Sequence, residues 1–105
     1  GQVCVAGTRV YVERPIYDEF IARMAQVADA LVVGNSLDPT TQIGPLVSEQ
    51  HLHRVSSYLE KGKSSGARVA AGGSQIRDGG LGRGYFVQPT VFADVTDDML
   101  VARED

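Results

Sequence analysis

The sequence has a single cysteine, Cys4, and no apolar run long enough to cross a bilayer. One cysteine cannot form an internal disulfide, which favours a reducing compartment. A spanning helix needs about 18–20 predominantly apolar residues, so no membrane partner is predicted. An initiating Met and a charged-then-apolar leader are also missing, and we therefore expect an amino terminus that has been cut or processed. These absences together predict a cytoplasmic protein.

Clusters of positive charge are missing as well. The chain carries 10 Lys and Arg against 13 Asp and Glu, a formal net charge of -3, and its basic residues are interleaved with acids. Nucleic-acid binding is therefore not predicted. The length of 105 residues suits one small domain at most, and 43% hydrophobic with 22% charged residues is ordinary for a globular chain.

Two segments show helical periodicity. Apolar residues recur at three- and four-residue spacings from Ile16 to Leu31, which predicts a helix that Gly34 would end in a left-handed conformation. Core packing explains this stripe better than cofactor or acyl-group binding. After a loop over 35–47, Ser48 is a good N-cap for a second helix reaching about residue 65, and Gly66 is its expected stop.

Three extended segments are predicted beside these helices. Alternating residues over 8–13 indicate a first strand, 68–71 a short second one, and 85–95 a third that Pro89 interrupts. A turn is expected at Asp97-Asp98. The fold class is therefore α/β, with two main helices packed on a few strands.

Several motifs look functional but lack their structural context. Gly62-Lys63-Ser64 resembles the end of a phosphate-binding loop, yet Ser57 stands where that motif needs glycine, and the lysine closes a predicted helix. The glycine-rich run 79–84 leads into a strand instead of a helix, which favours a flexible surface turn over a dinucleotide loop. His51 and His53 are two residues apart on a helix and share no face, so no metal site is predicted.

Cys4 lies in a stretch bracketed by glycines, directly before the first predicted strand: Gly1-Gln2-Val3-Cys4-Val5-Ala6-Gly7-Thr8-Arg9. A thiol in such a turn is well placed to act as a nucleophile. The alternative from the residues alone is a small buried hydrophobe, which is a common state of free cysteine.

The same stretch resembles the catalytic-cysteine signature of the NAD(P)-dependent aldehyde dehydrogenases. Other segments resemble landmarks of that family in its order and spacing, namely Pro15-Ile16-Tyr17-Asp18-Glu19-Phe20, Val33-Gly34-Asn35, Gln42-Ile43-Gly44-Pro45, Gly84-Tyr85-Phe86-Val87-Gln88-Pro89-Thr90-Val91-Phe92 and Ala102-Arg103-Glu104-Asp105. The resemblance covers essentially the whole chain and implies a fragment of the catalytic domain of such an enzyme, with residues 1–105 carrying the cysteine and the coenzyme-binding domain absent.

The resemblance also implies chemistry and site residues. Cys4 would attack an aldehyde to give a thiohemiacetal, NAD or NADP would accept the hydride, and a thioester would then be hydrolysed. Asp105 stands where the family has a glutamate that binds the nicotinamide ribose. His51 and Arg54 stand where relatives place a glutamine and a lysine near the same ribose, and an exposed helix face is the alternative reading for both. The family's second oxyanion donor, its general-base glutamate and its coenzyme domain precede the cysteine signature.

The activity expected of the parent enzyme is oxidation of an aldehyde to an acid, while the 105-residue chain alone is expected to be inactive. Unpaired strand edges favour self-association, so a homo-oligomer is predicted. Two rival interpretations remain: a non-catalytic structural or oligomerisation fragment, and an unrelated α/β binding domain.

Overall fold

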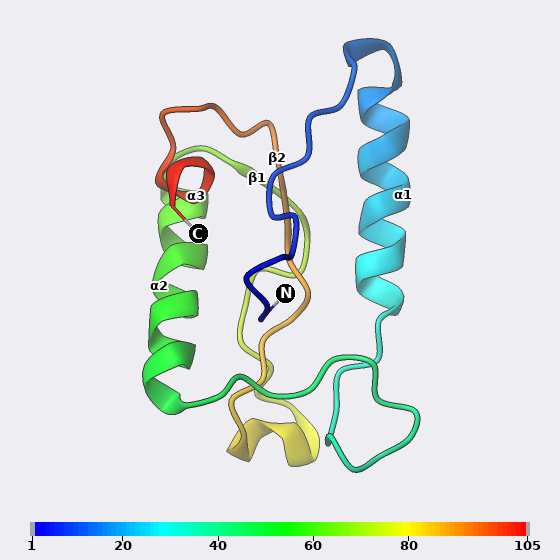
Figure 1. Ribbon diagram of the computed structural model, residues 1–105, viewed down its shortest axis with the longest axis vertical. Coiled ribbons are helices and arrows are strands. Elements are labelled where there is room, and N and C mark those ends of the chain that lie inside the picture. Colours follow the sequence, from blue (N-terminus) through cyan, green and yellow to red (C-terminus); the bar gives the residue numbers. More distant parts are fainter. Residues whose placement is uncertain (1, 105) are drawn as a thin grey trace.

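The computed structural model of the protein describes residues 2–104. Its elements follow the order η1 (Arg14–Ile16), α1 (Tyr17–Ala30), α2 (Glu49–Ser64), β1 (Arg68–Ala71), η2 (Gly79–Arg83), β2 (Val91–Ala93) and α3 (Leu100–Arg103), where η denotes a 3-10 helix. Figure 1 shows α1 and α2 on opposite sides of the two central strands, with α3 beside the end of α2. The predicted α/β arrangement of two main helices on a small sheet is confirmed.

Helix α1 packs its apolar stripe on the sheet. Ile21 and Ala28 are buried, and the helix contacts both β1 and β2. The predicted end at Gly34 is wrong, because α1 stops at Ala30 and Leu31 is already extended, with φ -65° and ψ 129°. The chain then runs alongside the following loop, where Val33 and Ile43 form an isolated bridge. This pairing, with β-branched residues that favour extended backbone, ends the helix before glycine is needed.

Helix α2 begins and ends as predicted. The Ser48 hydroxyl accepts a hydrogen bond from the His51 N–H at 3.1 Å, which satisfies one of the unpaired donors at the helix start. Leu52 and Leu59 are buried, and Gly66 has a φ of +99° just beyond the helix. Gly62 is also buried, because the ring of Phe92 lies where a side chain would start.

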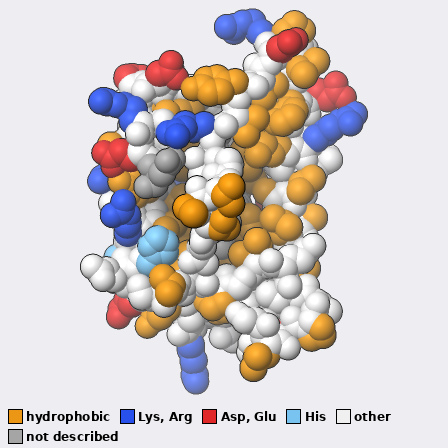
Figure 2. All heavy atoms as spheres, viewed as in Figure 1, with side chains coloured by type: hydrophobic (Ala, Val, Ile, Leu, Met, Phe, Trp, Pro, Cys, Tyr) orange, Lys and Arg blue, Asp and Glu red, His pale blue; other side chains and the backbone are white. Residues whose placement is uncertain are grey.

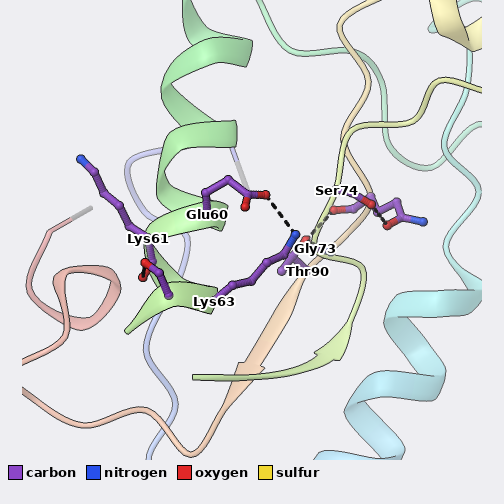
Figure 3. Close-up of polar contacts among 8 residues, drawn as sticks. Glu60, Lys61, Lys63, Gly73, Ser74 and Thr90 are labelled. Carbon is purple, nitrogen blue, oxygen red and sulfur yellow. Dashed lines mark hydrogen bonds and ion pairs between the residues drawn. The ribbon is translucent and has the colours of Figure 1, made fainter. Parts of the chain in front are cut away.

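The sheet consists of β1 and β2 in antiparallel pairing, with Val69 opposite Phe92 and a bulge before Ala71. An isolated bridge between Gln75 and Val87 extends the pairing beyond Pro89. The predicted strand over 68–71 is confirmed. Of the predicted strand over 85–95, only β2 and this bridge at Val87 are paired. Figure 3 shows a contact between the chain just after β1 and the chain just before β2, where the Gly73 N–H donates to the Thr90 hydroxyl at 2.9 Å.

The predicted strand over 8–13 is wrong, because this segment belongs to no ladder among residues 2–104. Its alternating sequence suits a strand, yet in the described structure β1 and β2 pair with each other and not with this segment. The run 79–84 is also more regular than the predicted flexible turn, because it contains η2.

The core is made of small and medium apolar side chains: Ile21, Ala28, Leu52, Leu59, Ala67, Ala71, Phe86 and Ala93. Many other apolar side chains are exposed, including Tyr11 at 86% and Leu37 at 90%. A groove of about 350 Å³ runs between segment 8–12, α1 and β2 and is lined partly by Phe20, Met24 and Val91. Figure 2 shows apolar side chains gathered on this side of the molecule.

Candidate active site

Cys4 lies in a β-turn near the start of the chain. The turn is closed by a hydrogen bond of 3.0 Å from the Ala6 N–H to the Val3 carbonyl. The thiol is free and the residue is exposed, so the alternative of a buried structural cysteine does not describe this conformation. An exposed thiol on a hydrogen-bonded turn is accessible to a small electrophile such as an aldehyde.

Two side chains of the cysteine stretch tie it to distant parts of the molecule. The Gln2 amide donates to the carbonyl of Pro45 at 3.1 Å, three residues before the N-cap of α2. The Arg9 guanidinium donates to the carbonyl of Ala102 in α3 at 3.0 Å. The segment that carries Cys4 is therefore held on both sides, by the approach to α2 and by α3.

His51 and Arg54 lie one turn apart on α2, so they share a face of the helix. His51 is half-buried in the first turn, whereas Arg54 is exposed. The Arg54 guanidinium lies 5.6 Å from the centroid of the Tyr58 ring, within the range of a cation–π interaction. Both residues offer N–H donors, which suit hydroxyl and phosphate oxygens.

The end of α3 returns to the same helix. The Tyr58 hydroxyl donates a hydrogen bond to the carboxylate of Glu104, which is the last described residue. This hydrogen bond is the main cause of a raised pKa of Tyr58, and the nearby negative charge of Glu104 adds to it. Asp105, the remaining predicted coenzyme residue, lies outside the described residues.

Within residues 2–104, no group of three or more His, Cys, Asp or Glu side chains is arranged to hold a metal ion. The described part of the chain also has no helix with the length and apolarity of a membrane span.

Comparison with known proteins decides the family. The family model described as "Aldehyde dehydrogenase family" matches residues 1–105, the whole chain. The chain belongs to the aldehyde dehydrogenase family. The resemblance inferred from the cysteine stretch and the segments after it is thereby confirmed, and the interpretation as an unrelated α/β domain is wrong.

Curated members of the aldehyde dehydrogenase family match over the full chain. A betaine aldehyde dehydrogenase of Rhizobium johnstonii is 52% identical over 105 residues, and one of Cereibacter sphaeroides is 50% identical. These 105 residues are 100% of this chain but 21% of each relative. The chain thus spans about a fifth of the length of its aldehyde dehydrogenase relatives.

Solved aldehyde dehydrogenases share the fold of this chain. An aldehyde dehydrogenase of Mycobacterium tuberculosis complexed with NAD+ is 47% identical with a TM-score of 0.93, over 99% of this chain and 21% of that one. A betaine aldehyde dehydrogenase of Staphylococcus aureus in complex with NAD+ has a TM-score of 0.95 at 33% identity, with the same shares covered.

Cys4, His51 and Arg54 were predicted from the sequence as site residues, whereas the contacts that hold the cysteine segment were not predicted. The hydrogen bonds of Gln2 and Arg9 join segments far apart in the chain, and no local pattern indicates such partners. Only their presence in the signature around Cys4 marked these two residues. The hydroxyl of Tyr58 donates to a carboxylate 46 residues away, and no local pattern indicates that partner either.

Proposed function

We propose that this chain is the cysteine-bearing part of an aldehyde dehydrogenase that oxidises an aldehyde to a carboxylic acid, with Cys4 as the nucleophile. The observation that carries the proposal is the exposed free thiol on the Val3–Ala6 turn, at the position of the family's cysteine signature. Family membership and the NAD+ complexes of similar enzymes support the reaction class.

The Cys4 thiolate attacks the aldehyde carbon, and the carbonyl oxygen takes up negative charge in a tetrahedral thiohemiacetal. The backbone N–H of Cys4 is the donor that we assign to this oxygen. When bound, NAD or NADP accepts a hydride from the former aldehyde carbon. The resulting thioester is hydrolysed by water and leaves Cys4 free for the next turnover.

His51, Arg54 and Asp105 are the residues that we assign to the coenzyme. The structure supports the first two through their shared face on α2, where an imidazole and a guanidinium supply donors to ribose hydroxyls or phosphate. Asp105 is assigned by its place in the family pattern alone. The donor types fit either NAD or NADP.

Residues 1–105 would form part of a larger catalytic domain, and the coenzyme-binding domain would belong to the rest of the enzyme. The exposed apolar side chains and the small fraction of each relative that the chain covers support this division. The chain alone would then be inactive, because the general base and the second oxyanion donor are supplied elsewhere.

A substitution of the nucleophile tests the proposal. In the full-length enzyme, Cys4→Ala is expected to lower kcat by about 10³-fold or more, since no other group replaces the attacking sulfur. Initial rates of NADH formation measure the loss. Betaine aldehyde is the first substrate to test, because the curated relatives carry that name, and octanal is an apolar comparison.

The matched control is Ser57→Ala, an exposed position on α2, which is expected to leave kcat within about twofold. Iodoacetamide should label the wild-type enzyme at Cys4 and not the Cys4→Ala variant at that position. Retained aldehyde oxidation by Cys4→Ala would refute the assignment.

The second candidate is a non-catalytic packing or oligomerisation unit. The two-stranded sheet and the exposed apolar groove favour it, because both leave surface that a second copy could cover. A full-length protein that binds no NAD+ and leaves Cys4 unreactive would support this candidate instead.

A further inference from the structure

A polar cluster joins α2 to the end of α3, and the proposed reaction assigns no role to two of its members, Tyr58 and Glu104. Two cations of the same helix lie over the Tyr58 ring: Arg54, one turn before it, at 5.6 Å from the centroid, and Lys61, about one turn after it, at 5.3 Å. Its hydroxyl donates to the Glu104 carboxylate beyond α3. One aromatic side chain thus contacts a proposed coenzyme residue and the far end of the chain.

The hydrogen bond of the Tyr58 hydroxyl affects the cation–π contacts of the Tyr58 ring. A carboxylate that accepts a hydrogen bond from a phenol increases the electron density of the ring and strengthens the attraction of a cation to its face. The phenol is protonated at neutral pH at its ordinary pKa of 10.0, and the hydrogen bond to Glu104 raises the pKa further, so the hydroxyl remains a donor. The exposed Arg54 side chain would otherwise sample many rotamers, and ordering them on coenzyme binding costs free energy.

We propose that Tyr58 is a positioning residue for the coenzyme: anchored by Glu104, its ring orients the Arg54 guanidinium before the nicotinamide ribose binds. The inference rests on the proposed function of Arg54 and extends it to two residues, Tyr58 and Glu104, that were not assigned to the coenzyme. It also gives α3 a role, because Glu104 directly follows this short helix and is held against α2 by the same contact.

Lys61 provides an internal comparison. It contacts the same ring but lies seven residues after Arg54, in the last turn of α2 and away from His51. Figure 3 shows Lys61 pointing away from Lys63, whose ammonium group pairs with Glu60 at 3.1 Å beside the strands. Lys61 thus shares the ring without sharing the proposed ribose site, and its removal tests the effect of charge alone.

The experiment is a titration of NAD+ into the full-length enzyme and its variants by calorimetry. Tyr58→Phe keeps the ring and removes the anchor, and it should raise Kd for NAD+ about threefold. Tyr58→Leu removes both and should raise Kd about tenfold. Glu104→Gln keeps a hydrogen-bond acceptor, so its Kd for NAD+ should be closer to that of the wild type than the Kd of Glu104→Ala. The Kd of Lys61→Gln should stay within twofold of the wild-type value.

A double-mutant cycle separates orientation of Arg54 from general support of the fold. Once Arg54→Ala is present, Tyr58→Leu should raise Kd no further, because the group it orients has gone. The alkylation rate of Cys4 should stay within twofold in every variant. The inference would be overturned if Arg54→Ala and Tyr58→Leu raised Kd for NAD+ additively, or if Tyr58→Leu left Kd unchanged. It would also be overturned if the variants slowed alkylation of Cys4 as much as they weakened NAD+ binding. Wild-type enzyme that binds no NAD+ would instead overturn the proposed function itself.

Discussion

At the scale of single residues, an absent side chain shapes the contact between α2 and β2. A Cβ built on Gly62 would lie 2.6 Å from the Phe92 ring, a separation that real Cβ atoms do not show. Glycine inside a helix normally costs about 1 kcal/mol relative to alanine. Its presence in the buried face of α2 therefore reflects the close approach of the Phe92 ring and not a need for flexible backbone.

Gly62→Ala is expected to destabilise the full-length enzyme by about 1–3 kcal/mol, because overpacking against the aromatic ring outweighs the gain in helix propensity. The melting temperature measures the effect. Ser57→Ala, at an exposed position of the same helix, changes helix propensity without changing core packing. It should leave the melting temperature unchanged or slightly higher. A Gly62→Ala variant as stable as this control would show that Phe92 moves aside at little cost.

Residues that belong to a local signature could be predicted, and residues that act through distant partners could not. Cys4 was recognisable from the eight residues around it. The anchors of its segment depend on where Pro45 and Ala102 lie after folding, 43 and 93 residues away from their donors. Long-range side-chain contacts of this kind follow from tertiary packing, for which one sequence holds no spacing rule.

At the scale of elements, helices were predictable and one strand was not. The periodicity of α1 and the Ser48 cap of α2 are local signals that tertiary structure preserved. A strand also needs a neighbouring strand, and within residues 2–104 segment 8–13 joins no ladder despite its alternating pattern. The end of α1 was wrong for a related reason, since the pairing of Val33 with Ile43 stops the helix early.

An ion pair between Arg68 and Asp94 joins β1 to the end of β2, and its carboxylate titrates in acid. Arg68, which begins β1, donates to Asp94 just after β2 at 2.9 Å, and the Asp94 N–H donates to the Tyr17 hydroxyl of α1 at 2.7 Å. Asp94 has a φ of +56°, a conformation that aspartate and asparagine tolerate better than most residues. The hydrogen bond from Arg68 is the main reason that the pKa of Asp94 is lowered from its ordinary value of 3.8.

A lowered folded-state pKa predicts how the pair responds to acid. Its contribution to stability is complete above pH 3.8 and is lost as the pH falls through the lower folded pKa of Asp94. Arg68→Met should therefore lower the melting temperature of the full-length enzyme at pH 7, and the difference from wild type should shrink below pH 4. Arg77→Met, at an exposed position after β1, is the control. A difference that is independent of pH would assign the effect to packing of the Arg68 side chain instead.

At the scale of the whole molecule, many large apolar side chains of the described residues are exposed. Val5, Tyr11, Leu37 and Val47 are each more than 80% exposed, and the groove beside α1 is apolar along much of its wall. Each of the two strands also pairs on one side only within residues 2–104. Such surface favours association with other protein, from the same enzyme or from a second copy.

The isolated 105-residue chain is therefore expected to self-associate, and light scattering should give a mass above the 11.2 kDa of a monomer. Tyr11→Lys with Val10→Lys, which places charge beside the groove, should shift the distribution toward monomer. Leu37→Lys, in a separate loop, is the matched control for added charge. A monodisperse wild-type monomer would contradict the expectation, and steady NADH production by the isolated chain would contradict its proposed inactivity.

The bond between Arg9 and Ala102 has a consequence for the order of events during synthesis. Its two partners are 93 residues apart, so the carbonyl that receives the guanidinium does not exist when the cysteine turn leaves the ribosome. At about 5–20 residues per second, synthesis of the 93 residues from Arg9 to Ala102 takes roughly 5 to 20 s. Throughout that time, the segment that carries the nascent thiol lacks its attachment to Ala102, and a polypeptide interrupted before residue 102 can never acquire it.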